Sequence, residues 1–449
     1  MNKVVNELGT EKISKLLIKQ AVPASIGILV MSLNMIVDTI FVGQWIGIMA
    51  IAAITVVLPI AFFISSIGMG IGIGGGSIIS RALGSKNFEK AYKTFGNQIT
   101  LTFGSSLIFV LLGTYFCFPI LQLFGANGDI VAPATEYFHI IIYGVPFFAF
   151  AMMGNPIIRA VGQPKFAMYT MIIPAIANIL FDILFIKVFD WGMYGAGLAT
   201  TISYATSGLF VLGFFLSSKS SLNIQVKNFV LDLNIVKEII SLGGVTIVRQ
   251  GTISLLIVIL NYTLFKYGGE VSIAIYGIIN RVMMFALFPV LGVTQGFLPI
   301  AGFNYGAKDA KRVKETIKTA ILYGTGVALL IFMGIVLFPS DVVRIFTENC
   351  ELLAKTPNAL LIAFLATPVI TAQLIGSAYF QAAGKAWPAL CLTLLKQGVF
   401  LIPLVYFLPQ YYGVTGVWMS FPIADVLATS ITVLYLRREL NKNIINENV

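Results

Sequence analysis

The sequence predicts an all-α integral membrane protein with twelve transmembrane helices in two homologous six-helix bundles related by pseudo-two-fold symmetry. Three observations predict this fold class. Apolar residues make up 58% of the 449 residues and charged residues only 11%, whereas about a quarter of the residues in soluble domains are charged. The two halves of the chain resemble each other when they are aligned at one constant offset. Each half also contains six apolar stretches long enough to cross a bilayer core of about 30 Å.

The internal repeat is clearest at glycine and proline residues, which set backbone geometry. At the constant offset the matching pairs include Gly47 with Gly269, Gly74 with Gly296, Pro146 with Pro368, and Gly162 with Gly384. Membrane transporters often have this form, with the substrate path between two homologous halves. We therefore expect an N-terminal lobe over residues 1–218, a cytoplasmic linker over 219–233 and a C-terminal lobe over 234–449.

The apolar stretches define the helices in chain order. In the first half we expect them at 20–43, 49–80, 92–118, 133–158, 165–189 and 194–217. In the second half we expect them at 238–265, 271–303, 316–338, 353–380, 386–409 and 414–436.

The basic residues predict the orientation of these helices. If both termini are cytoplasmic, 22 Lys and Arg residues lie in inner segments, four in outer segments and three within the spans. This distribution follows the positive-inside rule. We expect a multi-pass, monomeric protein of the bacterial plasma membrane with both termini in the cytoplasm. The net charge of +10 then reports topology, and no nucleic-acid partner is expected because the basic residues are divided among short loops.

Residues for several chemistries are missing from the sequence. The single histidine, His139, excludes histidine-based metal clusters and Ser-His triads. The nearest approach to a phosphate-binding loop, at Gly384 and Lys385, lacks the first glycine and the Ser or Thr of a Walker A motif. We therefore expect no enzyme activity and no cofactor. Uphill transport would have to draw on an ion gradient.

Three acidic residues lie within the expected spans, namely Asp38, Asp182 and Asp425. A charge at membrane depth is costly unless it is paired or hydrated, so such residues are functional candidates. Asp38 lies about five residues from the outer end of its helix and Asp182 about seven, which places both roughly 8–10 Å below the outer face at 1.5 Å per residue.

Polar residues on neighbouring turns complete a candidate site in the first lobe. Asn34 precedes Asp38 by one turn, Asn178 precedes Asp182 by one turn, and Thr200 reaches a similar depth. Two carboxylates that share a partly dehydrated site favour uptake of a proton. The same oxygens suit a sodium ion. The structural alternative is that each aspartate caps a broken helix or pairs with a donor.

The second lobe lacks this acidic pair. At the constant offset of the repeat Asp38 corresponds to Leu260, and Asp182 corresponds approximately to Leu404. The other polar residues at membrane depth in this lobe are basic or carry amides, and they include Arg249, Arg281 and Lys396. We therefore expect ion coupling to be confined to the first lobe.

Several short motifs, in order on twelve spans, resemble the multidrug and toxic compound extrusion (MATE) family over almost the whole chain. They include 38–43 (DTIFVG), 80–84 (SRALG), 159–164 (RAVGQP), 195–200 (GAGLAT) and 303–307 (FNYGA). The combination of Asp38 with Asn178 and Asp182 is similar to the branch that contains DinF-like and MepA-like pumps. The resemblance implies two bundles around a central cavity and a cation site at Asp38, Asn178, Asp182 and Thr200. It also implies that the first helix bends at Pro23.

The function implied by this resemblance is secondary active export. The pump would antiport cationic or amphiphilic organic compounds out of the cell against inward H⁺ or Na⁺, an activity associated with antibiotic resistance. The alternative is a flippase for lipid-linked precursors from the same wider superfamily, although such flippases tend to have extra helices and a more basic cavity. Aromatic and Met side chains suit a promiscuous apolar site. Those that we expect in the substrate cavity are Phe147, Met152, Met153, Met283 and Met284.

Overall fold

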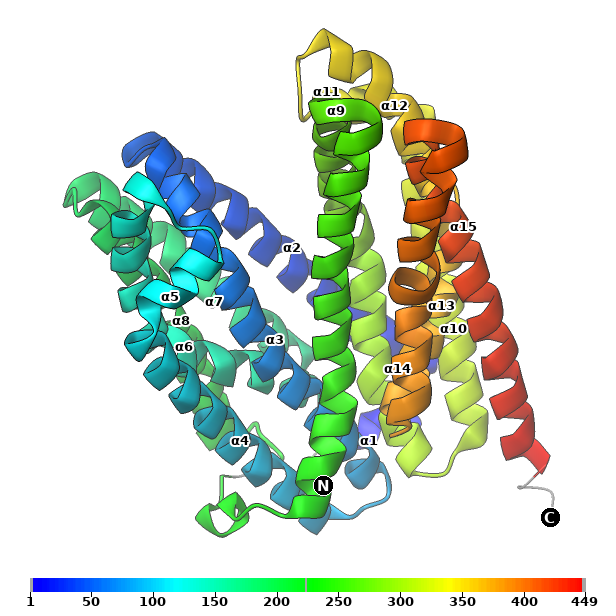
Figure 1. The fold of residues 1–449 in the computed structure, drawn as a ribbon. Helices are drawn as coiled ribbons and strands as arrows, with labels where there is room; N and C mark the ends of the chain where they lie inside the picture. The colour runs from blue at the N-terminus through cyan, green and yellow to red at the C-terminus, as the bar shows by residue number, and fades with distance from the viewer. Residues whose placement is uncertain (1–2, 223, 446–449) are drawn as a thin grey trace. The chain divides into compact units, whose positions relative to one another are not determined.

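The protein is described by a computed structural model that covers residues 3–222 and 224–445. Within these ranges helices are the only regular secondary structure (Figure 1), which confirms the predicted all-α class. The chain forms two compact units. Unit 1 contains the described residues up to Thr10 and Ile26–Thr246, and unit 2 contains Glu11–Ser25 and the described residues from Ile247 onward.

The first half of the chain contains a series of helices joined by short connections. They are α1 (Lys3–Thr10), α2 (Ile13–Trp45), α3 (Ile48–Gly84), α4 (Phe88–Tyr115), α5 (Cys117–Leu123), the 3₁₀ turn η1 (Gly128–Ile130), α6 (Val131–Ala160), α7 (Pro164–Asp182), the π-helical turn η2 (Ile183–Val188), α8 (Gly192–Leu216) and the 3₁₀ turn η3 (Val226–Phe229).

The second half begins with the longest helix. Its elements are α9 (Leu233–Gly306), α10 (Ala310–Leu337), α11 (Pro339–Arg344), α12 (Cys350–Phe364), α13 (Thr367–Ala382), α14 (Ala386–Leu394), the π-helical turn η4 (Leu395–Leu401) and α15 (Ile402–Ile445).

Nine helical segments of the described chain are long and apolar enough to cross a membrane, or ten if α12 and α13, which are bent by 45°, form one span. Two of these segments each contain two helices. The chain turns within α9 at Gly269 (φ 64°) and within α15 at Gly413 (φ 56°), where the absence of a Cβ atom permits a left-handed backbone. Figure 1 shows α9 as two arms, in green and yellow-green. Divided at these glycines, the segments follow the twelve predicted spans in order.

The boundary between the units differs from the one expected at residues 219–233. The first arm of α9 as far as Thr246 packs in unit 1, whereas Glu11–Ser25 of α2 pack in unit 2. Glycines permit both contacts. A Cβ atom on Gly74 in α3 would lie 2.9 Å from the backbone nitrogen of Gly243, and one on Gly296 would lie 2.8 Å from that of Ala21. The two pairs are equivalent in the internal repeat, so the repeat builds the same helix contact twice.

The segment before α9 is anchored to unit 1. The side chain of Asn97 in α4 donates to the carbonyl oxygens of Asn228 (3.3 Å) and Val230 (3.0 Å) and accepts from the backbone N–H of Asp232 (2.8 Å). On the first arm of α9, Glu238 forms ion pairs with Arg81 and with Lys90. The predicted linker is therefore held against α4.

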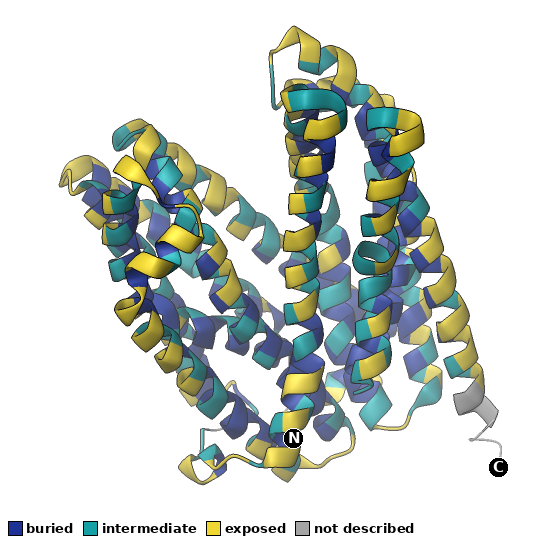
Figure 2. Ribbon diagram, in the orientation of Figure 1, coloured by how far each residue is buried: buried dark blue, intermediate teal, exposed yellow. Residues whose placement is uncertain are grey.

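Large apolar side chains are exposed along the outer faces of the helices. On α4, Phe103, Leu107 and Leu111 follow one another at intervals of four residues and are all exposed, so they form one face of the helix. Figure 2 shows exposed residues along the helices of both units. A surface of this kind is unfavourable in water and fits contact with lipid.

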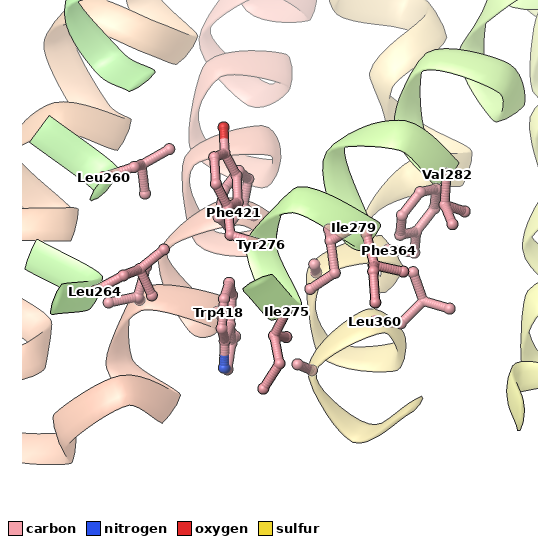
Figure 3. Packing of buried hydrophobic residues seen from close by; sticks show 14 of the residues in the cluster. Leu260, Leu264, Ile275, Tyr276, Ile279, Val282, Leu360, Phe364, Trp418 and Phe421 are labelled. Carbon is pink, nitrogen blue, oxygen red and sulfur yellow. The ribbon is translucent and has the colours of Figure 1, made fainter. Parts of the chain in front are cut away.

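The interior of unit 2 is a cluster of aliphatic and aromatic side chains from α9, α12 and α15 (Figure 3). Leu260 and Ile279 lie on opposite sides of the turn at Gly269, and both are fully buried. Phe364 and Trp418 contribute aromatic rings to the same cluster. Leu260, which corresponds to Asp38 in the repeat, therefore packs in a dry core.

Candidate functional site

Two of the three acidic residues predicted from the sequence, Asp38 and Asp182, lie in unit 1. Asn34 and Asp38 lie on one face of α2, and Asn178 and Asp182 lie on one face of α7. The amide nitrogen Nδ2 of Asn34 donates a hydrogen bond to Oδ1 of Asn178 at 3.0 Å. The carboxyl groups of Asp38 and Asp182, one turn further along their helices, are close enough to interact with each other.

The environment of this pair is poor in donors. Asp182 is 0% exposed and Asn178 is 4% exposed, whereas Asp38 is half-buried. Neither carboxylate oxygen of Asp182 accepts a hydrogen bond from the described part of the chain. An ionised carboxylate has no proton to donate, so the two carboxyl groups can share a hydrogen bond only if one of them is protonated. Buried polar atoms are normally paired, and the site is therefore suited to a proton or a cation.

The two amide side chains beside the carboxyl pair can each form a further polar interaction. Oδ1 of Asn34 and Nδ2 of Asn178 are both buried without a hydrogen-bond partner among the described residues. Oδ1 of Asn34 is a neutral acceptor of the type that binds hard cations such as Na⁺. No group of three His, Cys, Asp or Glu side chains gathers within residues 3–222 and 224–445. A sodium ion here would need amide or hydroxyl oxygens in addition to the two carboxylates.

A π-helical turn begins directly after Asp182. The helix α7 ends at this residue, and η2 continues from Ile183 to Val188. Isolated π turns are often found at functional sites because they change the direction of the neighbouring side chains. Sequence periodicity gives no signal for a change of this size, and we did not predict it.

Two tyrosines that were not predicted also belong to the site. Tyr137 in α6 is buried, and its hydroxyl lies 3.3 Å from Oγ1 of Thr200 in α8. Tyr137 is close enough to interact electrostatically with Asp38 and Asp182, and Tyr204 with Asp38. Tyr204 lies one turn after Thr200, so helical spacing from a predicted residue could have identified it. Thr200 itself is linked to the acidic pair through Tyr137.

An apolar pocket in unit 1 adjoins the site at Tyr204. The tyrosine ring stacks on Phe148, with a distance of 4.1 Å between ring centroids. The residues that line the pocket come from α3, α6 and α8, and they are Ile60, Ala61, Ile64, Phe138, Ile141, Ile142, Val145, Phe148 and Tyr204. None of the residues predicted for the substrate cavity is among them, although Phe148 is the neighbour of Phe147 in the chain.

The five residues predicted for the substrate cavity differ in accessibility. Phe147 is 41% exposed and Met284 is 44% exposed, whereas Met152 and Met283 are half-buried. Met153 is fully buried, and its backbone lies against Gly72 of α3. Because a buried residue at a close helix contact is used for packing, the structure favours a core role for Met153.

Pro23 lies in α2 just before the boundary between the units, which follows Ser25. Proline has no N–H to donate to the preceding turn, which weakens a helix locally. The hydroxyl of Ser25 donates to the carbonyl oxygen of Ala21 at 3.0 Å. The helix continues through Pro23, so the proposed bending point coincides with the place where α2 passes from unit 2 into unit 1.

Comparisons with known proteins agree with this arrangement. A sequence model of the MatE family matches residues 23–184 and 246–407. One match lies in each half of the chain, which confirms the repeat. The chain is 26% identical over 422 residues to the multidrug export protein MepA of Staphylococcus aureus, covering 93% of each chain. It is also 26% identical over 424 residues to the probable multidrug resistance protein YoeA of Bacillus subtilis, covering 92% of this chain and 91% of YoeA.

A solved structure has the same fold. It is the outward-facing conformation of a multidrug resistance MATE family transporter of the MOP superfamily. The two structures align with a TM-score of 0.92 at 25% identity, and the alignment covers 99% of each chain.

Proposed function

This chain belongs to the MatE family, and from that membership and the acidic site we propose that it exports organic cations and amphiphiles in exchange for inward H⁺ or Na⁺. The curated relatives MepA and YoeA carry the names of a multidrug export and a multidrug resistance protein. The observation that carries the proposal is that Asp38 lies beside the fully buried Asp182, whose carboxylate oxygens accept no hydrogen bond from the described residues. The proposal assigns binding and release to the chain and no chemical reaction.

The mechanism follows from the charge of the pair. When both carboxylates are ionised they repel each other in a site with little water, and uptake of a proton or Na⁺ relieves this repulsion. Asp38 lies on α2, which also contains Pro23. A ligand shifts a conformational equilibrium only as far as it binds one state better than the other. We infer that neutralisation of Asp38 favours one shape of α2 at Pro23, and that this change alternates the exposure of the site.

The substrate class is supported by the side chains near the site. The stacked rings of Phe148 and Tyr204 and the exposed Phe147 offer aromatic faces, which attract organic cations. We propose that these aromatic side chains of unit 1 contact the transported compound.

Dye transport by reconstituted protein tests the proposed function. We expect purified protein in liposomes to move an ethidium-like dye across the membrane when an opposing H⁺ or Na⁺ gradient is imposed, and not in its absence. Separate pH and Na⁺ gradients identify the coupling ion. An Asp38→Asn, Asp182→Asn double variant is the matched control for passive leak. Dye movement that is independent of both gradients, or translocation of lipid-linked precursors without dye movement, would contradict antiport.

The orientation predicted from the charge distribution is tested by cysteine labelling. Cys350 is exposed, so the three native cysteines should first be replaced by serine. A single Cys at Lys227 or Lys311 should then be shielded from an impermeant thiol reagent in intact cells, whereas one at Asp129 or Glu348 should be labelled. All four positions are exposed. The reverse pattern would show that the termini are external.

A further inference from the structure

A buried ion pair joins two helices of unit 2. The ammonium nitrogen Nζ of Lys396 in η4 lies 2.6 Å from Oδ1 of Asp425 in α15. The side chain of Asp425 is 3% exposed and that of Lys396 is 19% exposed. The proposed function makes no use of either residue.

Among the described residues, Asp425 forms an ion pair with Lys396 and with no other side chain. Among the elements packed against α15, α13 carries no charged residue and η4 carries only Lys396. The charged residues of α10 and α12 lie near the ends of those helices, at Ala310–Lys318 and Glu351–Lys355. Asp425 therefore depends on one counter-ion.

The helix α9 also packs against α15 in the core of unit 2. The charged side chains that it carries within unit 2 are Arg249, Lys266, Glu270 and Arg281. In the described part of the chain none of them forms an ion pair with Asp425.

The repeat places this pair between helices equivalent to those of the acidic site. At the constant offset of the repeat Lys396 corresponds to Pro174 in α7, and Asp425 corresponds to Ser203 in α8. In unit 1 the helices α7 and α8 contribute Asp182 and Thr200 to the acidic site. Unit 2 thus also has a buried carboxylate between the equivalent helices, but the chain provides the cation itself.

The local structure holds Lys396 in position. Lys396 is in the first turn of η4, which follows α14. One turn earlier, Oγ1 of Thr393 lies 2.6 Å from the hydroxyl of Ser377 in α13, and the side chain of Gln373 donates to the carbonyl oxygen of Leu392 at 3.0 Å. These polar contacts attach the end of α14 to α13. Lys396 is consequently presented by an anchored segment of the chain.

We propose that the ammonium group of Lys396 takes the place of a coupling ion at the carboxylate of Asp425 and thereby prevents unit 2 from binding that ion. A buried carboxylate without a partner would take up a proton or cation from solution, and an ion pair removes that need. Lys396 is then a positioning residue that determines where coupling occurs. This part of the inference rests on the proposed antiport function, whereas the role of Lys396 as the counter-ion does not.

Thermal unfolding of purified full-length variants as a function of pH tests the counter-ion role. In Lys396→Met the remaining carboxylate is unpaired, so protonation of the folded state should stabilise it, and the melting temperature should rise as pH falls. In Asp425→Asn the remaining ammonium is unpaired, so the loss of stability should be largest at low pH and should shrink as pH rises. The double variant Lys396→Met, Asp425→Asn should show neither trend and should follow the wild-type profile.

Transport by the double variant tests the coupling role. We expect dye efflux that still depends on the gradient, because the acidic site of unit 1 is intact. Identical pH profiles for wild type and Lys396→Met would overturn the counter-ion role even if the protein transports nothing. A stable double variant that has lost gradient dependence would instead show that the pair takes part in coupling, and would overturn the proposal. If wild type itself shows no gradient-driven transport, the proposed function fails, and the unfolding profiles still decide the role of Lys396.

Discussion

Asp38→Asn and Asp182→Asn are each expected to reduce gradient-driven efflux close to the level of protein-free liposomes. Each substitution removes a titratable group with almost no change of shape. Asp182 is fully buried, and its carboxylate oxygens accept no hydrogen bond from the described residues, so the neutral amide should be tolerated by the fold. A site that cannot change its charge cannot respond to the gradient. Dye efflux from liposomes under an imposed gradient, normalised to folded protein, measures the effect.

Asp129→Asn is a matched control for these variants. Asp129 lies in the short turn η1 and is exposed, so the same chemical change should leave efflux unaltered. Proton release or Na⁺ binding by purified protein provides a second readout, and it should be lost in the Asp38 and Asp182 variants alone. Wild-type efflux in both site variants would show that coupling does not depend on the contact between these carboxyl groups.

Gly243→Ala should be strongly destabilising, whereas Gly244→Ala should not. A Cβ atom at Gly243 would press against the backbone of Gly70 in α3, and its distance from the carbonyl carbon of Gly70 would be 2.7 Å. Because backbone atoms cannot move aside as a flexible side chain can, the helices would have to separate. Overpacking of a close contact typically costs about 1–3 kcal/mol. We expect a clear fall in the melting temperature of the purified protein.

The adjacent glycine is the control. A Cβ atom at Gly244 meets no atom within 4 Å, and alanine favours a helix over glycine by about 0.5–1 kcal/mol. Gly244→Ala should therefore have an unchanged or slightly higher melting temperature. Equal effects of the two substitutions would mean that helix propensity rather than the contact with α3 decides the stability of the first arm of α9.

The acidic site shows which residues of a site can be predicted from the sequence. Asp38 and Asp182 could be placed at one depth because the rise of a helix is constant and the ends of the spans were known. Their neighbours Asn34 and Asn178 followed from helical spacing alone. Tyr137 was not found, since it is on a different helix and its proximity to Thr200 depends on how α6 packs against α8.

The division into units shows the opposite case. The internal repeat predicted two lobes joined by a linker over residues 219–233, but residues 234–246 pack in unit 1 and Glu11–Ser25 pack in unit 2. Two helices each contribute to both units, and glycine contacts at Gly74 and Gly296 decide which arm packs where. Hydropathy identifies the membrane spans, but it does not show which helices pack against one another.

The sequence by itself therefore determined the helical class, the order of the spans, the duplication and the residues of the acidic pair. These properties depend on composition and on distances along one helix, which are the same in any packing. Only the tertiary structure decided which helices share a unit, which tyrosines reach the acidic pair, and that Asp425 is paired with Lys396. Those contacts join segments far apart in the chain, and their geometry is set by close packing between helices.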